Sequence, residues 1–303
     1  QPREYYERTV LEAAAFQANF TMLAGYAFGT RMFRKDPVAL AAWDGISAGL
    51  NFVERHIDLY RDARPVADVA VYYSFASRAR AEASKEKYDW ESDIENLLLA
   101  GVPATILIDY QATASSADEL AKQFRAIVLT RADCLSDEEI ALLREYASKG
   151  GSLIVSETTG AHNNFLARRM NQPFFTGETA IQRLMANERL PEGIGRILKR
   201  HPPVELVGGS GFQFAMPNLS GKLGVIHVVN YDLPERTAGL SVRIHPSASK
   251  TWNNLFAHRL QAKWIPAPFG EATDLTVEPA DSGIVVKAPK MGAGGLIVLT
   301  PIP

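Results

Sequence analysis

Strand-like and helix-like segments alternate between residues 67 and 160, and this alternation limits the possible folds more than any other feature. Four runs of apolar, β-branched residues are typical of strands that are buried on both faces. Helical patterns separate these runs, which gives the order β-α-β-α-β-α-β. The order predicts a parallel sheet covered by helices on both faces, with its strands within residues 66–74, 104–108, 124–133 and 152–156.

Start and stop signals define one of these helices closely. Ser136, with Glu139 three residues later, forms a capping box, in which each residue can satisfy a backbone N–H of the other. Gly150 and Gly151 then end the apolar periodicity. We predict this helix over residues 137–148. A second helix is predicted over residues 90–100, directly before a helix-stopping glycine.

The segments on either side of this region have different patterns. Residues 1–66 are mostly helical in periodicity, and the helix predicted over residues 37–61 places six apolar side chains on one face: Leu40, Trp43, Ile46, Leu50, Val53 and Ile57. After residue 202, short strand-like runs alternate with Gly, Pro, Asn and Asp, as in a small antiparallel β-sandwich. We therefore expect three domains, over residues 1–66, 67–202 and 203–303.

Net charge and hydrophobicity limit the classes of partner that we expect for this chain. The chain has 32 Lys and Arg against 34 Asp and Glu, so it lacks the basic excess of nucleic-acid-binding proteins. The longest apolar stretch, residues 16–29, is too short to span a bilayer and carries Gln17 and Asn19. We expect neither nucleic acid nor a membrane as a partner. The sequence does not define the cellular compartment, and we slightly favour the cytoplasm.

Polar side chains follow the last predicted strand of the sheet, where ligands of open parallel sheets bind. Ser156 stands at this strand-to-turn junction and could be an exposed nucleophile, with nearby His162 as its base. However, the glycines that flank a nucleophile elbow are missing on both sides of Ser156. The alternative is that Ser156 caps the next segment. Glu157, also at the strand end, is a candidate acid for glycoside hydrolysis or a solvated surface carboxylate.

Cys134 is the single cysteine, so an intramolecular disulfide is excluded. It follows the third predicted strand and precedes the capped helix, and Arg131 could stabilise a thiolate there. Asp133 and Asp137 oppose that effect, which favours a structural cysteine. The six histidines are scattered without the spacing of a zinc motif, and His227 lies in an apolar strand. We predict no metal and no cofactor.

Three stretches together resemble a known family: NFVERHIDLYRDARPVADVAVYYS (51–74), RAIVLTRADCLSDEEIALLREYASKGGSLIVSETTG (125–160), and GVIHVVNYD (224–232) with IVVKAPKMGAGGLIVL (284–299). Their order resembles the C-terminal half of bacterial glycoside-hydrolase-like proteins with a β-galactosidase trimerisation domain. That domain has a flavodoxin-like, class I glutamine amidotransferase-like fold.

The resemblance implies a chain in three parts. Residues 1–66 would be the last helices of a TIM barrel, with residues 16–29 resembling its final strand region. A flavodoxin-like domain and a β-sandwich would follow. The catalytic acids of the family would lie on earlier barrel strands, so we expect the chain to be the C-terminal part of a longer protein. Ser156 and Glu157 stand where true amidotransferases have a Cys, so amidotransferase chemistry is not expected.

Three functions follow as hypotheses. The first is the accessory and assembly portion of a carbohydrate-active glycoside hydrolase, a homo-oligomer with carbohydrate as a possible ligand. The second is a free-standing ester or amide hydrolase that uses Ser156 or Cys134. The third is a non-catalytic binding or oligomerisation module.

Overall fold

The computed structural model describes residues 3–18, 26–170, 180–183, 190–198, 201–208, 213–231, 239–246 and 250–302. The chain forms two compact units. Unit 1 combines residues 1–66 with residues 203–246 and 250–303, and unit 2 comprises residues 67–202 with residues 247–249. The helical N-terminal segment and the β-rich C-terminal segment thus share one unit. No helix among the described residues combines the length and hydrophobicity needed to cross a bilayer.

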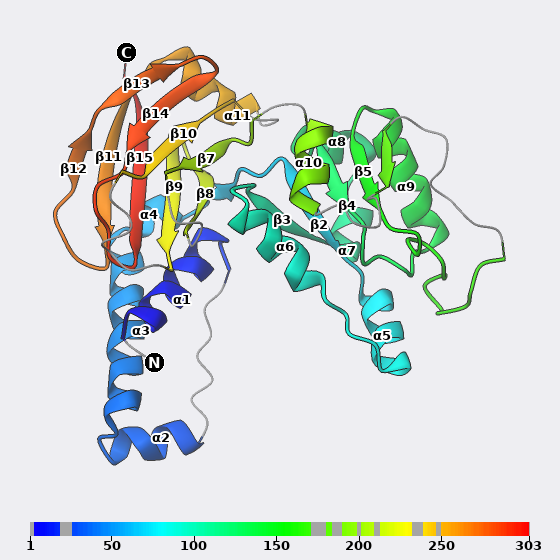
Figure 1. Cartoon of the computed structure of the whole chain (residues 1–303), viewed down its shortest axis with the longest axis horizontal. Helices are drawn as coiled ribbons and strands as arrows, with labels where there is room; N and C mark the ends of the chain where they lie inside the picture. Colours follow the sequence, from blue (N-terminus) through cyan, green and yellow to red (C-terminus); the bar gives the residue numbers. More distant parts are fainter. Residues whose placement is uncertain are drawn as a thin grey trace. The chain divides into compact units, whose positions relative to one another are not determined.

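Unit 2 is built on a parallel sheet of five strands in the order β3-β2-β4-β5-β6 (Figure 1). The strands are β2 (Val69–Tyr73), β3 (Ala104–Ile108), β4 (Ala126–Val128), β5 (Ser152–Val155) and β6 (Ile181–Arg183). The helices are α5 (Phe75–Ser84), α6 (Trp90–Leu99), α7 (Asp109–Thr113), α8 (Ala117–Gln123), α9 (Asp137–Ser148) and α10 (Leu190–Leu198). The predicted parallel sheet is confirmed.

Helices cover both faces of this sheet, because successive strand residues point to opposite sides. On one face Tyr72 and Ile127 pack with Leu143 of α9 in a single core. On the other face Val71 and Val128 form a core with residues of α6 and α10, among them Leu97, Leu190 and Ile194. Strands buried on both faces explain why their sequences are continuous apolar runs rather than alternating ones.

The capping box of α9 is confirmed. Ser136 Oγ accepts from the Glu139 N–H at 3.1 Å, and the Ser136 N–H donates to the Glu139 carboxylate at 2.6 Å. Tyr72 Oη donates to the other carboxylate oxygen, which ties the helix start to β2. At the far end Gly150 takes φ +96°, and a Cβ at Gly151 would lie 2.1 Å from Tyr146 Cζ. Only glycines therefore fit both positions.

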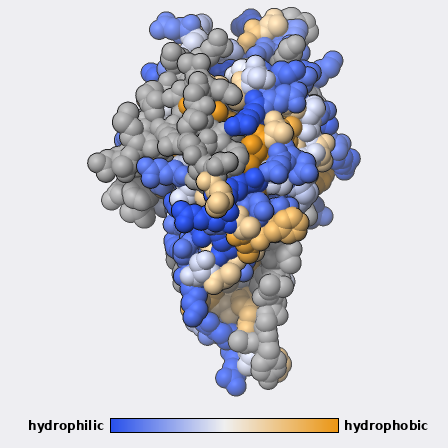
Figure 2. All heavy atoms as spheres, turned by 90° about the vertical axis from the view of Figure 1, so that its right-hand side faces the viewer, coloured by the Kyte–Doolittle hydropathy of each residue, from blue (hydrophilic) through white to orange (hydrophobic). Residues whose placement is uncertain are grey.

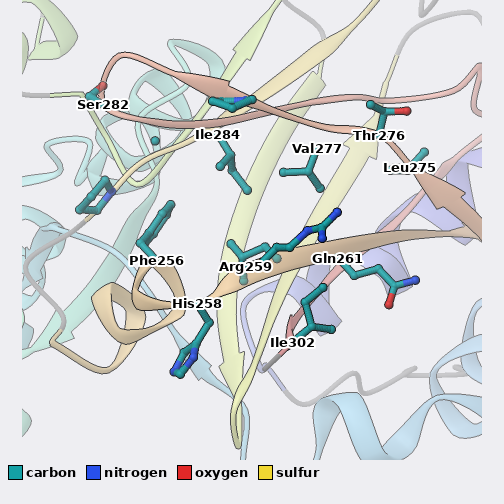
Figure 3. A pocket seen from close by; sticks show the side chains of 14 residues that line it. Phe256, His258, Arg259, Gln261, Leu275, Thr276, Val277, Ser282, Ile284 and Ile302 are labelled. Atoms are coloured by element: carbon teal, nitrogen blue, oxygen red, sulfur yellow. The ribbon is translucent and has the colours of Figure 1, made fainter.

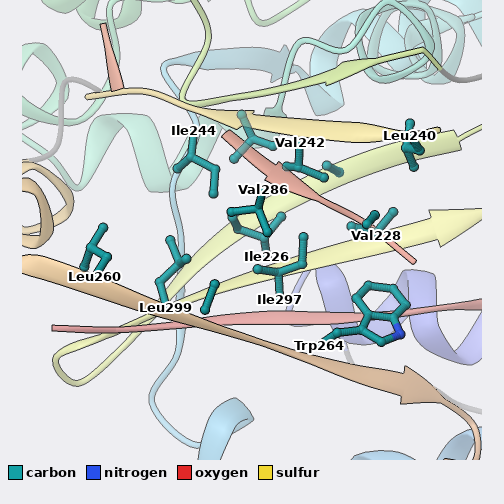
Figure 4. Close-up of a cluster of buried hydrophobic side chains, with 14 of the residues drawn as sticks. Ile226, Val228, Leu240, Val242, Ile244, Leu260, Trp264, Val286, Ile297 and Leu299 are labelled. Carbon is teal, nitrogen blue, oxygen red and sulfur yellow. The ribbon is translucent and has the colours of Figure 1, made fainter. Parts of the chain in front are cut away.

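Two antiparallel sheets enclose the core of unit 1. The six-stranded sheet has the order β1-β8-β9-β15-β11-β12, and the four-stranded sheet has the order β13-β14-β10-β7. Figure 4 shows Ile226, Val228 and Ile297 of the first sheet facing Val242 and Val286 of the second. The strands are β1 (Arg64–Pro65), β7 (Val204–Val207), β8 (Gln213–Ser220), β9 (Leu223–Asn230), β10 (Ser241–Ile244), β11 (Arg259–Ala267), β12 (Thr273–Leu275), β13 (Val277–Ala280), β14 (Gly283–Lys287) and β15 (Gly294–Ile302).

The helices of residues 1–66 are α1 (Arg3–Ala15), α2 (Tyr26–Phe33), α3 (Pro37–Arg55) and α4 (Ile57–Tyr60), with α11 (Lys250–Asn253) and a 3-10 turn (Asn254–Ala257) later in the chain. Of the helices of residues 1–66, α1 and α4 pack on the six-stranded sheet, α3 packs on α1, and α2 packs on α3. Asn218 Nδ2 donates to the Ala15 carbonyl at 3.0 Å, and Ser220 Oγ donates to the Asp58 carbonyl at 3.1 Å. β1 extends the sheet by pairing with β8. These contacts explain why the helical segment belongs to this unit.

The helix predicted over residues 37–61 is wrong in two respects. It is divided at His56 into α3 and α4. Moreover, α3 packs against α1 through small residues rather than through the whole predicted apolar face. A Cβ at Gly45 would lie 2.4 Å from Arg3 O, and one at Gly49 would lie 2.7 Å from Val10 Cβ. This close approach leaves three large apolar side chains of α3 partly exposed: Leu40, Trp43 and Leu50. Ile57, the first residue of α4, is also partly exposed.

The predicted terminal barrel strand region, residues 16–29, falls mostly outside the described residues. Its last four residues, from Tyr26, are helical as part of α2 rather than extended.

Candidate functional site

The polar side chains predicted at the carboxyl ends of the sheet do gather at one edge of unit 2. Ser156 follows β5, Cys134 lies in the connection between β4 and α9, and an isolated bridge pairs Cys134 with His162. The His162 N–H donates to the Asp133 carbonyl at 2.9 Å, and the His162 carbonyl accepts from the Leu135 N–H at 3.1 Å. The backbone therefore brings these residues together.

The hydroxyl of Ser156 belongs to a network of threonines. It lies 3.2 Å from Thr158 Oγ1 and 3.1 Å from Thr159 Oγ1. Thr158 donates its own proton to Asp133, and Thr159 donates to the Leu129 carbonyl at 2.9 Å. Because each threonine hydroxyl has already donated its single proton, its oxygen can only accept a hydrogen bond from the Ser156 hydroxyl. The Ser156 proton points at a hydroxyl and not at a base, which is the arrangement of a loop-capping residue.

The ring of His162 is not joined to Ser156. Its Nδ1 atom is buried and has no hydrogen-bond partner among the described residues. Burial lowers the pKa of His162, and the nearby Arg80 guanidinium lowers it further. A neutral imidazole could act as a base, but a base must lie within hydrogen-bond reach of its nucleophile.

Cys134 is fully buried, with none of its surface accessible. Its N–H donates to Ser77 Oγ at 2.8 Å, and its carbonyl accepts from Ser74 Oγ at 3.0 Å. Burial raises the pKa of the thiol, although the Arg80 guanidinium opposes this effect. A buried neutral thiol is poorly nucleophilic, so the surroundings favour a structural cysteine.

Glu157 is exposed in the turn after β5. It lies one residue beyond the Ser156 network and makes no ion pair within the described part of the chain. Catalytic roles for Ser156, Glu157, His162 and Cys134 stay predictions, since the hydrogen bonds present support capping and packing.

Sequence reasoning missed an aromatic cavity at the carboxyl ends of β2 and β3. Its volume is about 560 Å³, and Tyr73, Phe75, Tyr88 and Trp90 contribute rings to its lining. The signal available in the sequence was the local density of aromatic residues in YYSF (72–75) and YDW (88–90). The sequence does not predict that these two groups of rings meet, because residues 88–90 reach residues 72–75 only through the turn after α5.

Unit 1 contains a larger cavity of about 950 Å³. Figure 3 shows it between β11 and the strands β13 and β14, with Ile284, Val277 and Phe256 on its apolar side. Arg259 and Gln261 of β11 supply polar groups. It therefore lies where the two sheets diverge.

Of the described residues, those best suited to hold a divalent cation are His245 and Glu205, with His201 four residues before Glu205. His245 Nε2 lies 3.8 Å from the Glu205 carboxylate, and His245 Nδ1 lies 2.9 Å from Ser282 Oγ. Two imidazoles and a carboxylate are suitable ligands for zinc. The predicted absence of a metal is not tested by this cluster and stays a prediction.

The sequence matches no protein-family model and no curated protein. Solved structures do match. An α-L-fucosidase (isoenzyme 2) from Paenibacillus thiaminolyticus covers 100% of this chain with a TM-score of 0.62 and 10% identity. This chain shares its fold with parts of glycoside hydrolases. A β-galactosidase from Bacillus circulans sp. alkalophilus covers 90% at TM-score 0.52 and 10% identity, and a rhamnosidase from Novosphingobium sp. PP1Y covers 86% at TM-score 0.54 and 12% identity.

These glycoside hydrolases are longer than the chain. The match spans 58% of the fucosidase, 45% of the β-galactosidase and 25% of the rhamnosidase. At such low identity the comparison establishes a shared fold and transfers no residue role.

Proposed function

We propose that this chain is the accessory and assembly portion of a carbohydrate-active glycoside hydrolase, whose catalytic acids lie on another part of the protein. The observation that carries this proposal is the coverage: the fucosidase matches the chain from end to end, yet 42% of the fucosidase has no counterpart, since 100% less 58% is 42%. The hydrolysed bond would be that of a hexose or deoxyhexose glycoside, the class named in the matching structures.

The sheet topologies of the two units support a more specific proposal for each unit. The order β3-β2-β4-β5-β6 places the first strand second, as in flavodoxin-like sheets of order 2-1-3-4-5. Two facing antiparallel sheets suit a β-sandwich. On this proposal unit 2 is a β-galactosidase trimerisation-like domain and unit 1 carries the sandwich together with the helical end of a barrel.

The apolar side chains exposed on α3 support the assembly part of the proposal. Leu40, Trp43 and Leu50 are 42%, 50% and 44% exposed, and we call them the α3 stripe. Trp43 lies three residues after Leu40 and seven before Leu50, so the three side chains lie on one side of the helix. A stripe of this kind marks an interaction surface. In the assembled protein, a second copy of the chain would cover it.

On the face that Figure 2 shows, hydrophobic residues lie in small groups among hydrophilic ones. Phe33, Phe165 and Met170 are 90%, 83% and 99% exposed, so exposed apolar side chains are not confined to the α3 stripe.

The reading frame upstream of the codon for Gln1 tests the proposal. We expect it to continue in frame and to encode a domain with paired carboxylates at strand ends. A stop codon directly upstream, or an unrelated domain, would contradict the proposal and leave the free-standing hydrolase and the oligomerisation or binding module as the remaining hypotheses.

A further inference from the structure

The aromatic cavity of unit 2 has a defined floor and walls. Ile106 and Ile108 of the edge strand β3 form part of the floor, beside Tyr73 at the end of β2. The walls come from α5, the turn after it, and the start of α6. Ile106 keeps 38% of its surface exposed although it is a strand residue, because no helix covers this part of the sheet. The volume of about 560 Å³ is within the range of small-ligand sites.

Its rings are held in place by one buried residue. Tyr73 is 7% exposed and meets three rings edge-on: Phe75 at 5.1 Å, Tyr88 at 5.7 Å and Trp90 at 5.1 Å between centroids. Phe75 is 52% exposed and stacks on Tyr110. Edge-to-face contacts fix ring orientation. The cavity thus presents aromatic surface that is already oriented before any ligand binds.

Hydrogen-bonding groups are positioned around these rings. Arg78 Nη1 donates to Tyr73 Oη at 2.9 Å, and its Nε pairs with Glu82 at 2.8 Å. Glu86 pairs with Arg80 at 2.8 Å. Tyr88 Oη accepts from the Ser74 N–H at 3.1 Å. Each of these side chains is therefore held by a partner within the unit.

The lining also indicates the charge of a ligand. Glu82, Glu86 and Glu91 face a single cation, Arg78, in the lining. This balance disfavours anionic ligands. Glu82 and Glu86 are each paired with an arginine, which leaves Glu91 as the lining carboxylate without an ion pair among the described residues. A neutral ligand with both an apolar face and several hydroxyl groups fits best.

We propose that this cavity binds a neutral pyranoside of the galactose type. The C–H face of such a sugar, left clear of hydroxyls by the axial 4-OH, would lie on Phe75 and Trp90. Its hydroxyls would donate to Glu91 and accept from Arg78. The choice of a sugar rests on the proposed function, whereas the cavity and its lining do not. A protein partner with a flat surface would make little contact with the floor of this cavity.

Saturation-transfer NMR of the full 303-residue chain with methyl β-D-galactopyranoside tests this inference. We expect saturable transfer to the ring protons, and none to D-glucitol, which has hydroxyls but no ring face. Phe75→Ala weakens binding about ten-fold, which corresponds to about 1.4 kcal/mol. Glu91→Gln also weakens it. Phe165→Ala is the matched control, because Phe165 is 83% exposed in the same unit but does not line the cavity.

Phe75→Leu keeps an apolar contact with Tyr73 and serves if Phe75→Ala does not fold. Three results would overturn the inference: no saturable transfer to the galactoside, equal binding in the two Phe75 variants and wild type, or displacement of the sugar by tetramethylammonium. Failure of this inference is distinguishable from failure of the proposed function. A chain that binds no sugar in this cavity can still be the accessory portion of a hydrolase, and the upstream reading frame tests that role separately.

Discussion

Association through the α3 stripe gives the most quantitative test of the assembly role. Trp43 is 50% exposed, so roughly 100 Å² of its side chain remains to be covered. At about 25 cal/mol per Å² this area contributes roughly 2.5 kcal/mol, of which the methyl group of alanine would retain a part. Trp43→Ala should therefore weaken self-association of the 303-residue chain by about 2 kcal/mol for each Trp43 that the interface buries, or about 30-fold in the dissociation constant for each.

Sedimentation equilibrium over the micromolar range measures this constant directly. Leu50→Ala, at 44% exposure on the same stripe, should act in the same direction with a smaller effect. Phe165→Ala removes an exposed ring of unit 2 that is not on the stripe and should leave association unchanged. Thermal unfolding midpoints control for loss of fold. A wild-type chain that stays monomeric, or a Trp43→Ala variant that associates as strongly as wild type, would refute the reasoning.

Further predictions concern the sheet edge and the core. Ser156→Ala and Cys134→Ala should leave any hydrolysis of p-nitrophenyl acetate unchanged, and a loss in either variant would restore that residue as a nucleophile. Ser136→Ala should lower the free energy of unfolding by about 1 kcal/mol in urea titrations, because α9 loses its cap; an unchanged midpoint would show that the cap is dispensable. Burial lowers the pKa of His227 to about 3 from 6.5, so the unfolded chain binds a proton that the folded chain lacks. Stability should be complete above pH 6.5 and fall by up to about 1.4 kcal/mol per pH unit below it, a slope that His227→Phe should remove.

Local signals in the sequence were sufficient for parts of the fold. The cap at Ser136 and the glycines after Ser148 predicted α9 with its observed bounds, because both signals act through backbone groups a few residues apart. β3 was also predicted at residues 104–108, since a helix-stopping glycine precedes a short apolar run.

Long-range contacts were the part that the sequence did not reveal. Tyr72 and Glu139 are 67 residues apart, and Arg80 and Asp133 are 53 apart, yet each pair is in contact. Periodicity placed Trp43 on an apolar face of its helix, but only the structure shows that small residues such as Gly45 make the contact with α1. The threonine network around Ser156 was likewise hidden, because it depends on how the turn folds back on β4.

Hydrolysis of p-nitrophenyl glycosides tests the central claim most directly. The 303-residue chain and the full product of its reading frame would be compared on β-D-galactoside, α-L-fucoside and α-L-rhamnoside substrates. The account predicts that the full product releases p-nitrophenol from at least one of them while the 303-residue chain releases none. Glycoside hydrolysis by the 303-residue chain alone, or by neither protein, would contradict it.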